Sequence, residues 1–263
     1  MPLTPFQEQV AALLAVDRSP DSYLAGGAAM HIAPTSQRYS NDLDYFQDSV
    51  ERVASAFAAD RARLGEHGFV VEVALEQAGF ARAVVRKGRD ATKVDWAHDA
   101  SWRFLPPLRH PVAGYVLHPV DLAVNKLLAL VGRDEPRDFL DIMFAHRSIL
   151  SLGALCWAGA GKDPGFTPAL LLTLLRRRGR NRPEDLARLR LREQPDLVAL
   201  KREWLEALEQ AQAFVEMRPA DELGCLYYST SRGEFVSDFT PGDPDIVPHH
   251  GKPGGSLPAS PAP

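Results

Sequence analysis

The sequence is poor in cysteine and in long apolar runs. Only two cysteines, Cys156 and Cys225, occur among the 263 residues, and neither belongs to a metal-binding spacing, so we expect two reduced thiols and no disulfide framework. The amino terminus lacks a basic stretch followed by an apolar one, and the longest apolar runs are much shorter than a membrane span. We therefore expect a soluble, cytoplasmic protein with no membrane partner.

Excess positive charge is also lacking. The net charge is -4, so contact with a nucleic acid would have to come from a local basic patch. Hydrophobic residues make up 45 % of the chain, which is enough for a core and excludes wholesale disorder. The length suits one large domain, or a catalytic domain followed by a smaller helical one.

The hydrophobic pattern predicts an α/β fold, with a mixed or antiparallel sheet flanked by helices and followed by a helical region. Apolar residues at helical spacing predict helices over 5–16, 50–67 and 120–131, and another from Pro136. Alternating residues predict strands over 23–25, 41–47, 69–76, 80–85 and 92–97. We expect a catalytic domain over 1–150, a helical domain over 151–220, and an extension over 221–263 whose Pro- and Gly-rich tail is flexible from Pro241.

Two carboxylates in the strand over 41–47 are the main candidates for chemistry. Asp42 and Asp44 are separated by one residue, so in a strand they point to the same face. Like charges this close repel unless a cation neutralises them, and Mg²⁺ prefers oxygen ligands. The pattern alone is weak, because a solvent-exposed strand edge produces it as well.

Three neighbouring features strengthen the prediction of a metal site. Gly26 and Gly27 follow a short strand, where backbone amides can approach phosphates. Asp95 is a third carboxylate on a later strand and would complete a two-metal site. Lys126 lies off the apolar stripe of its helix and could neutralise a triphosphate. The alternatives are an ordinary turn, a solvent-facing strand residue and a surface lysine.

The run LAGGAAMHIAPTSQRYSNDLDYF resembles the nucleotidyltransferase motif, in which a Gly pair and a spacer precede Asp-x-Asp. It is most similar to the AbiEii/AbiGii toxin family, whose Arg-x-Ser-x-Asp-x-Asp element corresponds here to Arg38, Ser40, Asp42 and Asp44. The block HPVDLAVNKLLALVGRDEPRDFLDI resembles a later motif of that family. Its matching positions are Lys126, Arg133, Arg137, Asp138 and Asp141.

This resemblance implies the minimal nucleotidyltransferase fold of the polymerase-β-like superfamily. It further implies transfer of a nucleoside monophosphate from an NTP to an acceptor hydroxyl, with Mg²⁺ or Mn²⁺ held by Asp42, Asp44 and Asp95. The resemblance assigns the NTP to the remaining motif positions, which are Gly26, Gly27, Arg38, Ser40, Lys126, Arg137 and Asp138. Family members usually carry Ser or Thr beside the Gly pair, whereas this chain has Ala28. Arg137 and Asp141 could instead form only a surface ion pair.

The sequence does not identify the molecule that accepts the nucleotide. The segment 176–192 is the one basic patch, and we expect Arg176, Arg177, Arg178 and Arg180 to contact an RNA acceptor; a solvated helix face is the alternative. The toxin-like branch implies the 3′ end of a tRNA and a possible cognate antitoxin. A small-molecule, antibiotic-type acceptor and a catalytically degenerate NTP-binding module are the competing hypotheses.

Overall fold

The computed structural model describes residues 3–33, 36 and 38–258. By the density of contacts the chain divides into two compact units. The first unit comprises Met1–Ser101, Pro106–His118 and the short segment Arg190–Arg192. The second comprises Trp102–Leu105, Pro119–Leu189 and Glu193–Pro263. The division between these two compact units thus falls near residue 118.

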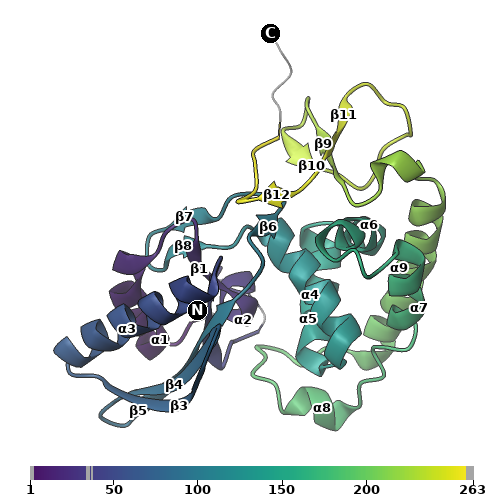
Figure 1. Cartoon of the computed structure of the whole chain (residues 1–263). Coiled ribbons are helices and arrows are strands. Elements are labelled where there is room, and N and C mark those ends of the chain that lie inside the picture. Colours follow the sequence, from purple (N-terminus) through teal and green to yellow (C-terminus); the bar gives the residue numbers. More distant parts are fainter. Residues whose placement is uncertain (1–2, 34–35, 37, 259–263) are drawn as a thin grey trace. The chain divides into compact units, whose positions relative to one another are not determined.

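The first unit is built on a seven-stranded mixed sheet with the order β3-β4-β5-β2-β1-β8-β7 (Figure 1). Its elements are α1 (Pro5–Leu14), η1 (Ala15–Asp17), β1 (Ser22–Ala25), α2 (Gly26–Met30), β2 (Asp42–Gln47), α3 (Val50–Glu66), β3 (Val70–Gln77), β4 (Phe80–Lys87), β5 (Asp90–His98), β7 (Leu108–His110) and β8 (Gly114–Val116). β2 pairs in parallel with β5, and β1 with β8, whereas the other pairs are antiparallel. The predicted α/β class with a mixed sheet is confirmed.

Local signals explain where these elements begin and end. Thr4 and Gln7 form a reciprocal capping box at the start of α1, and Ser49 caps α3 by accepting a hydrogen bond from the Arg52 amide. α3 covers one face of the sheet, where Trp96 of β5 is fully buried and its ring lies 5.0 Å from that of Phe57. The opposite face of β2 and β5 is therefore the one that can carry polar chemistry.

The second unit is mainly helical. It contains β6 (Trp102–Arg103), α4 (Pro119–Arg133), α5 (Pro136–Ser148), α6 (Leu152–Lys162), α7 (Pro168–Leu175), α8 (Pro183–Ala187), α9 (Leu197–Glu216), η2 (Ala220–Glu222), β9 (Leu226–Ser229), β10 (Glu234–Phe235), β11 (Ile246–His249) and β12 (Lys252–Pro253). The apolar stripe of α9 packs inward through Leu200, Trp204, Leu208 and Ala211. Within the described residues, no single helix is long and apolar enough to span a membrane, although the bent pair α5–α6 passes by length and composition alone.

The structure differs from our expectations for the end of the chain. We expected no strands after about residue 150 and a flexible tail from Pro241, but β11 pairs with β9, and β12 with β6. The His249 imidazole also lies 2.9 Å from the Phe104 carbonyl oxygen, where its Nε2 forms a hydrogen bond. Short strands that pair with distant segments leave too little periodicity to be recognised locally. The last five residues, 259–263, lie outside the described part of the chain.

Candidate functional site

The predicted carboxylates lie together on one face of the first unit's sheet. Asp42 and Asp44 alternate with Leu43 on β2, and the parallel register places Asp44 opposite Asp95 and Asp42 opposite Lys93. Asp42 is 9 % exposed and Asp95 6 %, while Asp44 is half-buried. The structure therefore brings together the three residues that we predicted as metal ligands.

Two cations balance this acidic face. The Lys93 ammonium lies 2.9 Å from Asp42 Oδ2 and 3.8 Å from Asp95 Oδ2. Arg82, the cross-strand partner of Asp95 on β4, donates to both carboxylate oxygens, from Nε at 2.9 Å and from Nη2 at 2.7 Å. Sequence analysis missed Arg82, because it becomes a neighbour of Asp95 only through strand register. Alternation along the strand did predict that Lys93 shares a face with Asp95, but its contact with Asp42 depends on register.

The glycine pair lies directly against the carboxylates. Gly26 has a φ of +62°, and a Cβ there would lie 2.0 Å from Asp44 Oδ2, so a side chain at this position would displace the carboxylate. A Cβ on Gly27 would lie 2.6 Å from Arg38 Nη2 and 3.1 Å from Ser40 Oγ. Four predicted positions, Gly26, Gly27, Arg38 and Ser40, thus lie together with Asp44 of the Asp-x-Asp motif.

Ser40 and Arg38 line this site from the segment that precedes β2. The Ser40 hydroxyl donates a hydrogen bond to Asp42 Oδ1 at 3.0 Å. Arg38 is 6 % exposed and forms an isolated bridge with Leu191, while the neighbouring Tyr39 amide donates to the Arg190 carbonyl at 2.9 Å. The end of the arginine-rich segment therefore belongs to the first unit. The sequence does not indicate this contact, because the two segments are far apart along the chain.

The second block of motif residues forms a buried charge cluster in the second unit. The Lys126 ammonium lies 3.0 Å from Asp138 Oδ1 and 2.8 Å from Asp141 Oδ2, and both carboxylates are completely buried. Arg133 adds hydrogen bonds to Asp138 from Nε at 2.6 Å and from Nη2 at 3.1 Å. The alternatives of a surface lysine and a surface Arg137–Asp141 ion pair were wrong, because Lys126 and Asp141 are buried.

The electrostatics of this cluster favour the ionised carboxylate. Burial alone would raise the pKa of Asp138, but the hydrogen bond from Arg133 and the charges of Lys126 and Arg133 outweigh it. The pKa of Asp138 is therefore held below its usual value. Arg137 is half-buried, and its Nε has no hydrogen-bond partner among the described residues.

The predicted basic patch is only partly exposed. Arg176, Arg177 and Arg180 are exposed, and Arg176 also donates to Gln212 at 3.1 Å. Arg178 differs, because it contacts the Val131 carbonyl and lies 3.4 Å from Asp134. Three of the four predicted RNA contacts are thus available at the surface of the second unit, and the fourth is part of its packing.

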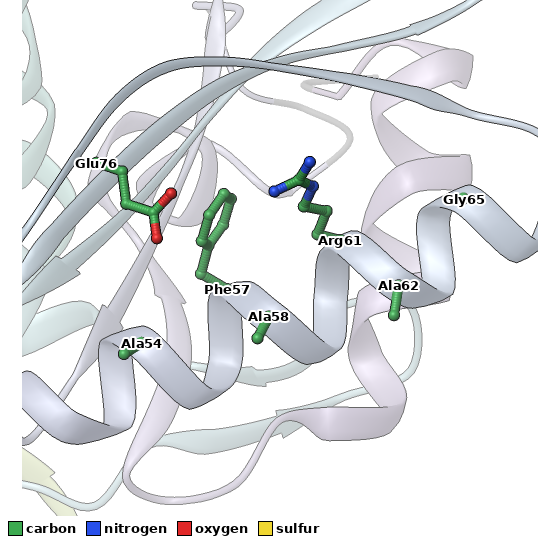
Figure 2. Close-up of a pocket in the computed structure, with 7 residues that line it drawn as sticks. All are labelled: Ala54, Phe57, Ala58, Arg61, Ala62, Gly65 and Glu76. Atoms are coloured by element: carbon green, nitrogen blue, oxygen red, sulfur yellow. The ribbon is translucent and has the colours of Figure 1, made fainter.

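A cavity of about 440 Å³ lies elsewhere in the first unit. Figure 2 shows Phe57 and Arg61 of α3 and Glu76 of β3 around it. It lies on the side of the sheet that α3 covers, so it is separate from the carboxylate face. Its remaining lining residues are small, and they add no candidate for chemistry to those predicted from the sequence.

The carboxylate face fits one divalent cation better than two. Asp42 and Asp44 present oxygen ligands of the kind that Mg²⁺ takes, and Gly26 keeps bulk away from Asp44. Both oxygens of Asp95, however, already accept hydrogen bonds from one guanidinium, that of Arg82, whereas Asp42 is held by the Ser40 hydroxyl at Oδ1 and the Lys93 ammonium at Oδ2. Within the described residues, no group of three or more His, Cys, Asp or Glu side chains is arranged to hold a metal ion.

Comparison with known proteins agrees with the motifs. The family model described as "Nucleotidyl transferase AbiEii toxin, Type IV TA system" matches residues 10–223, whereas no curated protein matches the chain. A candidate nucleotidyltransferase from Helicobacter pylori is 15 % identical, has a TM-score of 0.50, and is aligned over 80 % of this chain and 94 % of its own. MenT4, a nucleotidyltransferase toxin from Mycobacterium tuberculosis, is 21 % identical, with a TM-score of 0.49 and coverage of 82 % and 83 %.

Proposed function

We propose the reaction below on the premise that this chain belongs to the AbiEii family of nucleotidyl transferase toxins of type IV toxin–antitoxin systems. Membership makes the protein a nucleotidyltransferase and implies an NTP substrate and a cognate antitoxin. Beyond this, we propose that it transfers a nucleoside monophosphate to a hydroxyl of RNA, with the 3′ end of a tRNA as the acceptor. The observation that carries the proposal is the juxtaposition of Asp42, Asp44, Gly26 and Gly27.

The roles that we propose follow from this geometry. Asp42 and Asp44 would hold the divalent cation, which would supply charge neutralisation to the triphosphate. Gly26 and Gly27 form the first turn of α2 beside Asp44 and Ser40, and their backbone amides would bind phosphate oxygens. The Ser40 hydroxyl would join them by giving up its hydrogen bond to Asp42. Ala28 cannot donate a side-chain hydrogen bond, so the phosphate contact would rest on these groups.

The transfer itself needs one bond made and one broken. The acceptor hydroxyl oxygen attacks the α-phosphorus, the bond from that phosphorus to the bridging oxygen of the β-phosphate breaks, and pyrophosphate leaves. Asp95 is proposed to take the proton of the attacking hydroxyl. The family resemblance also assigns nucleotide contacts to Lys126, Arg137 and Asp138, but Lys126 and Asp138 are paired with each other inside the second unit, so we propose that this pair has a structural role there.

The support for an RNA acceptor is the exposure of Arg176, Arg177 and Arg180, because phosphate contacts dominate affinity for nucleic acids. Competing acceptors make different predictions. A small-molecule acceptor would leave RNA unlabelled while nucleotide is consumed, and a degenerate module would bind NTP without any transfer.

The test is incubation of the purified protein with each NTP labelled at the α-phosphate, Mg²⁺ and total RNA, followed by purified tRNA. We expect label from one NTP to appear in RNA and to be lost with EDTA. Asp44→Asn should abolish the label, whereas Asp90→Asn, at the exposed first residue of β5, should leave it unchanged. Absence of labelled RNA with every NTP would reject the RNA acceptor.

A further inference from the structure

The carboxylates and their cations form an ordered pattern across the sheet. In one row, Arg82 of β4 lies opposite Asp95 of β5, which in turn lies opposite Asp44 of β2. In the neighbouring row, Lys93 lies opposite Asp42. Asp95 and Asp42 therefore each have a cation at the cross-strand position. A single guanidinium binds both oxygens of Asp95, whereas Lys93 and the Ser40 hydroxyl each contact one oxygen of Asp42.

The two members of the Arg82–Asp95 pair differ in their freedom to move. The Asp95 side chain is 9 % exposed and the Arg82 side chain 40 %. A buried carboxylate that loses a close cation is strongly destabilised. The other cation near Asp95 is Lys93, which lies 3.8 Å from Asp95 but 2.9 Å from Asp42, so Asp95 has to keep a close positive partner. Arg82 can swing into solvent, but only when another cation takes its place beside Asp95.

We infer that Arg82 is a positioning residue that holds Asp95 away from metal ligation until nucleotide binds. In the nucleotide-free protein, Asp42 and Asp44 would hold the divalent cation. When the triphosphate arrives, the Arg82 guanidinium transfers to its phosphate oxygens, and Asp95 becomes available to the cation and to the acceptor hydroxyl. This inference rests on the proposed function and adds to it an order of assembly.

The chemistry of both exchanged partners supports this order. A guanidinium binds phosphate and carboxylate with the same two-pronged geometry, so Arg82 loses little on changing partner. The triphosphate brings negative charge, and the accompanying cation brings the positive charge that Asp95 would otherwise lack. No residue is left with an unpaired buried charge at any stage.

The same strand provides a matched control. Arg86 lies four residues beyond Arg82 on the same face of β4, and its Nε lies 2.9 Å from Glu72 Oε2 of β3. Both members of this pair are about half exposed, at 48 % and 53 %, and among the described residues Arg86 pairs with Glu72 and not with Asp42, Asp44 or Asp95. Arg86→Gln therefore removes an arginine ion pair from β4 without touching the site.

The experiment is isothermal titration of the full chain with Mn²⁺, first alone and then with a non-hydrolysable NTP analogue. Without nucleotide, Asp44→Asn should weaken Mn²⁺ binding, whereas Asp95→Asn should leave it unchanged. Arg82→Gln should strengthen Mn²⁺ binding about tenfold, equivalent to about 1.4 kcal/mol, and should weaken binding of the analogue. Arg82→Lys should bring the affinities for Mn²⁺ and for the NTP analogue part of the way back to the wild-type values. Arg86→Gln should resemble the wild type in both affinities.

The double variant Arg82→Gln/Asp95→Asn removes both charges of the pair and guards against misfolding of the single variant. It should return Mn²⁺ affinity to the wild-type value. If Asp95→Asn weakened nucleotide-free Mn²⁺ binding as much as Asp44→Asn, or if Arg82→Gln matched Arg86→Gln, the inference would be wrong. If Asp44→Asn also bound Mn²⁺ normally, the proposed function itself would fail.

Discussion

The two charge clusters of this protein differ in how their cations are held. In the first unit, Lys93 and Arg82 are 35 % and 40 % exposed beside carboxylates on an open sheet face. In the second unit, Lys126 is 9 % exposed between two completely buried carboxylates. An open cluster can exchange its cations for a metal ion and phosphates, whereas a closed cluster holds a fixed arrangement. The same residue types thus serve different purposes according to burial.

The largest expected effect concerns the open cluster. Asp44→Asn should reduce transfer at least about a hundredfold, because each 1.4 kcal/mol of lost transition-state stabilisation costs a factor of ten. Its melting temperature should stay close to that of the wild type, because the substitution relieves repulsion with Asp95. Parallel assays of RNA labelling and thermal unfolding would check this. A variant that retained activity but melted early would make Asp44 structural and erase the contrast between the clusters.

The closed cluster should respond in stability. Lys126→Met leaves Asp138 and Asp141 without their shared cation and should destabilise the protein by about 3–5 kcal/mol. Lys93→Met, in the open cluster, should cost no more than about 1 kcal/mol. Urea denaturation of both variants gives the comparison. Equal losses would show that exposure does not separate the two clusters.

A buried carboxylate whose nearby cations, Lys162 and Arg103, do not outweigh the effect of burial sharpens the same contrast. Asp121 accepts hydrogen bonds from the Phe104 and Leu105 amides at 2.8 and 3.0 Å, and burial raises its pKa to about 6. The folded pKa exceeds the unfolded one, so this contribution is fully present below about pH 4 and is lost as the pH rises through 6.

The expected contribution of Asp121 to the free energy of unfolding is about 3 kcal/mol, because each unit of pKa shift corresponds to about 1.36 kcal/mol. It should appear as the difference in pH dependence between wild type and Asp121→Asn from pH 4 to 7. Asp138, whose pKa is lowered, would titrate only below this window. Identical pH profiles of wild type and Asp121→Asn would contradict the assignment.

Removal of the last strands should affect the second unit alone. A chain that ends at Thr240 lacks β11 and β12 and the contact of His249 with Phe104. It should melt at least about 5 °C lower, since 1 kcal/mol corresponds to about 2–4 °C at this size. Mn²⁺ binding through Asp42 and Asp44 should persist. Loss of that binding would mean that the open cluster depends on the second unit's strands.

The smallest effect on stability belongs to the exposed arginines. Arg176→Ala, Arg177→Ala and Arg180→Ala together should reduce the slope of log binding constant against log salt concentration by about two. Each lost phosphate contact contributes roughly 0.7 to this slope. Arg178→Ala is the contrasting change, because it removes packing against Val131 and Asp134 and should lower stability instead. RNA affinity insensitive to salt and to the triple change would favour a small-molecule acceptor.

Local pattern and spacing were enough to predict much of the first unit. Alternation predicted β2 and β5, and the i, i+2 spacing predicted that Asp42 and Asp44 share a face. Apolar periodicity predicted α3 and α4, and motif order predicted the family. These features depend on neighbours within a few residues, so the chain carries them in its linear order.

Tertiary structure decided which charges meet. Strand register paired Arg82 with Asp95 and Lys93 with Asp42, and helix packing buried Lys126 with Asp138 and Asp141. Long-range pairing also ordered the residues after Pro241 into β11 and β12. None of these contacts has a local signature, because the partners are separated by 12 or more residues in the sequence. For the strand residues, the pairing also depends on the register of the whole sheet. The sequence by itself determined the carboxylates, and the fold determined their counter-ions.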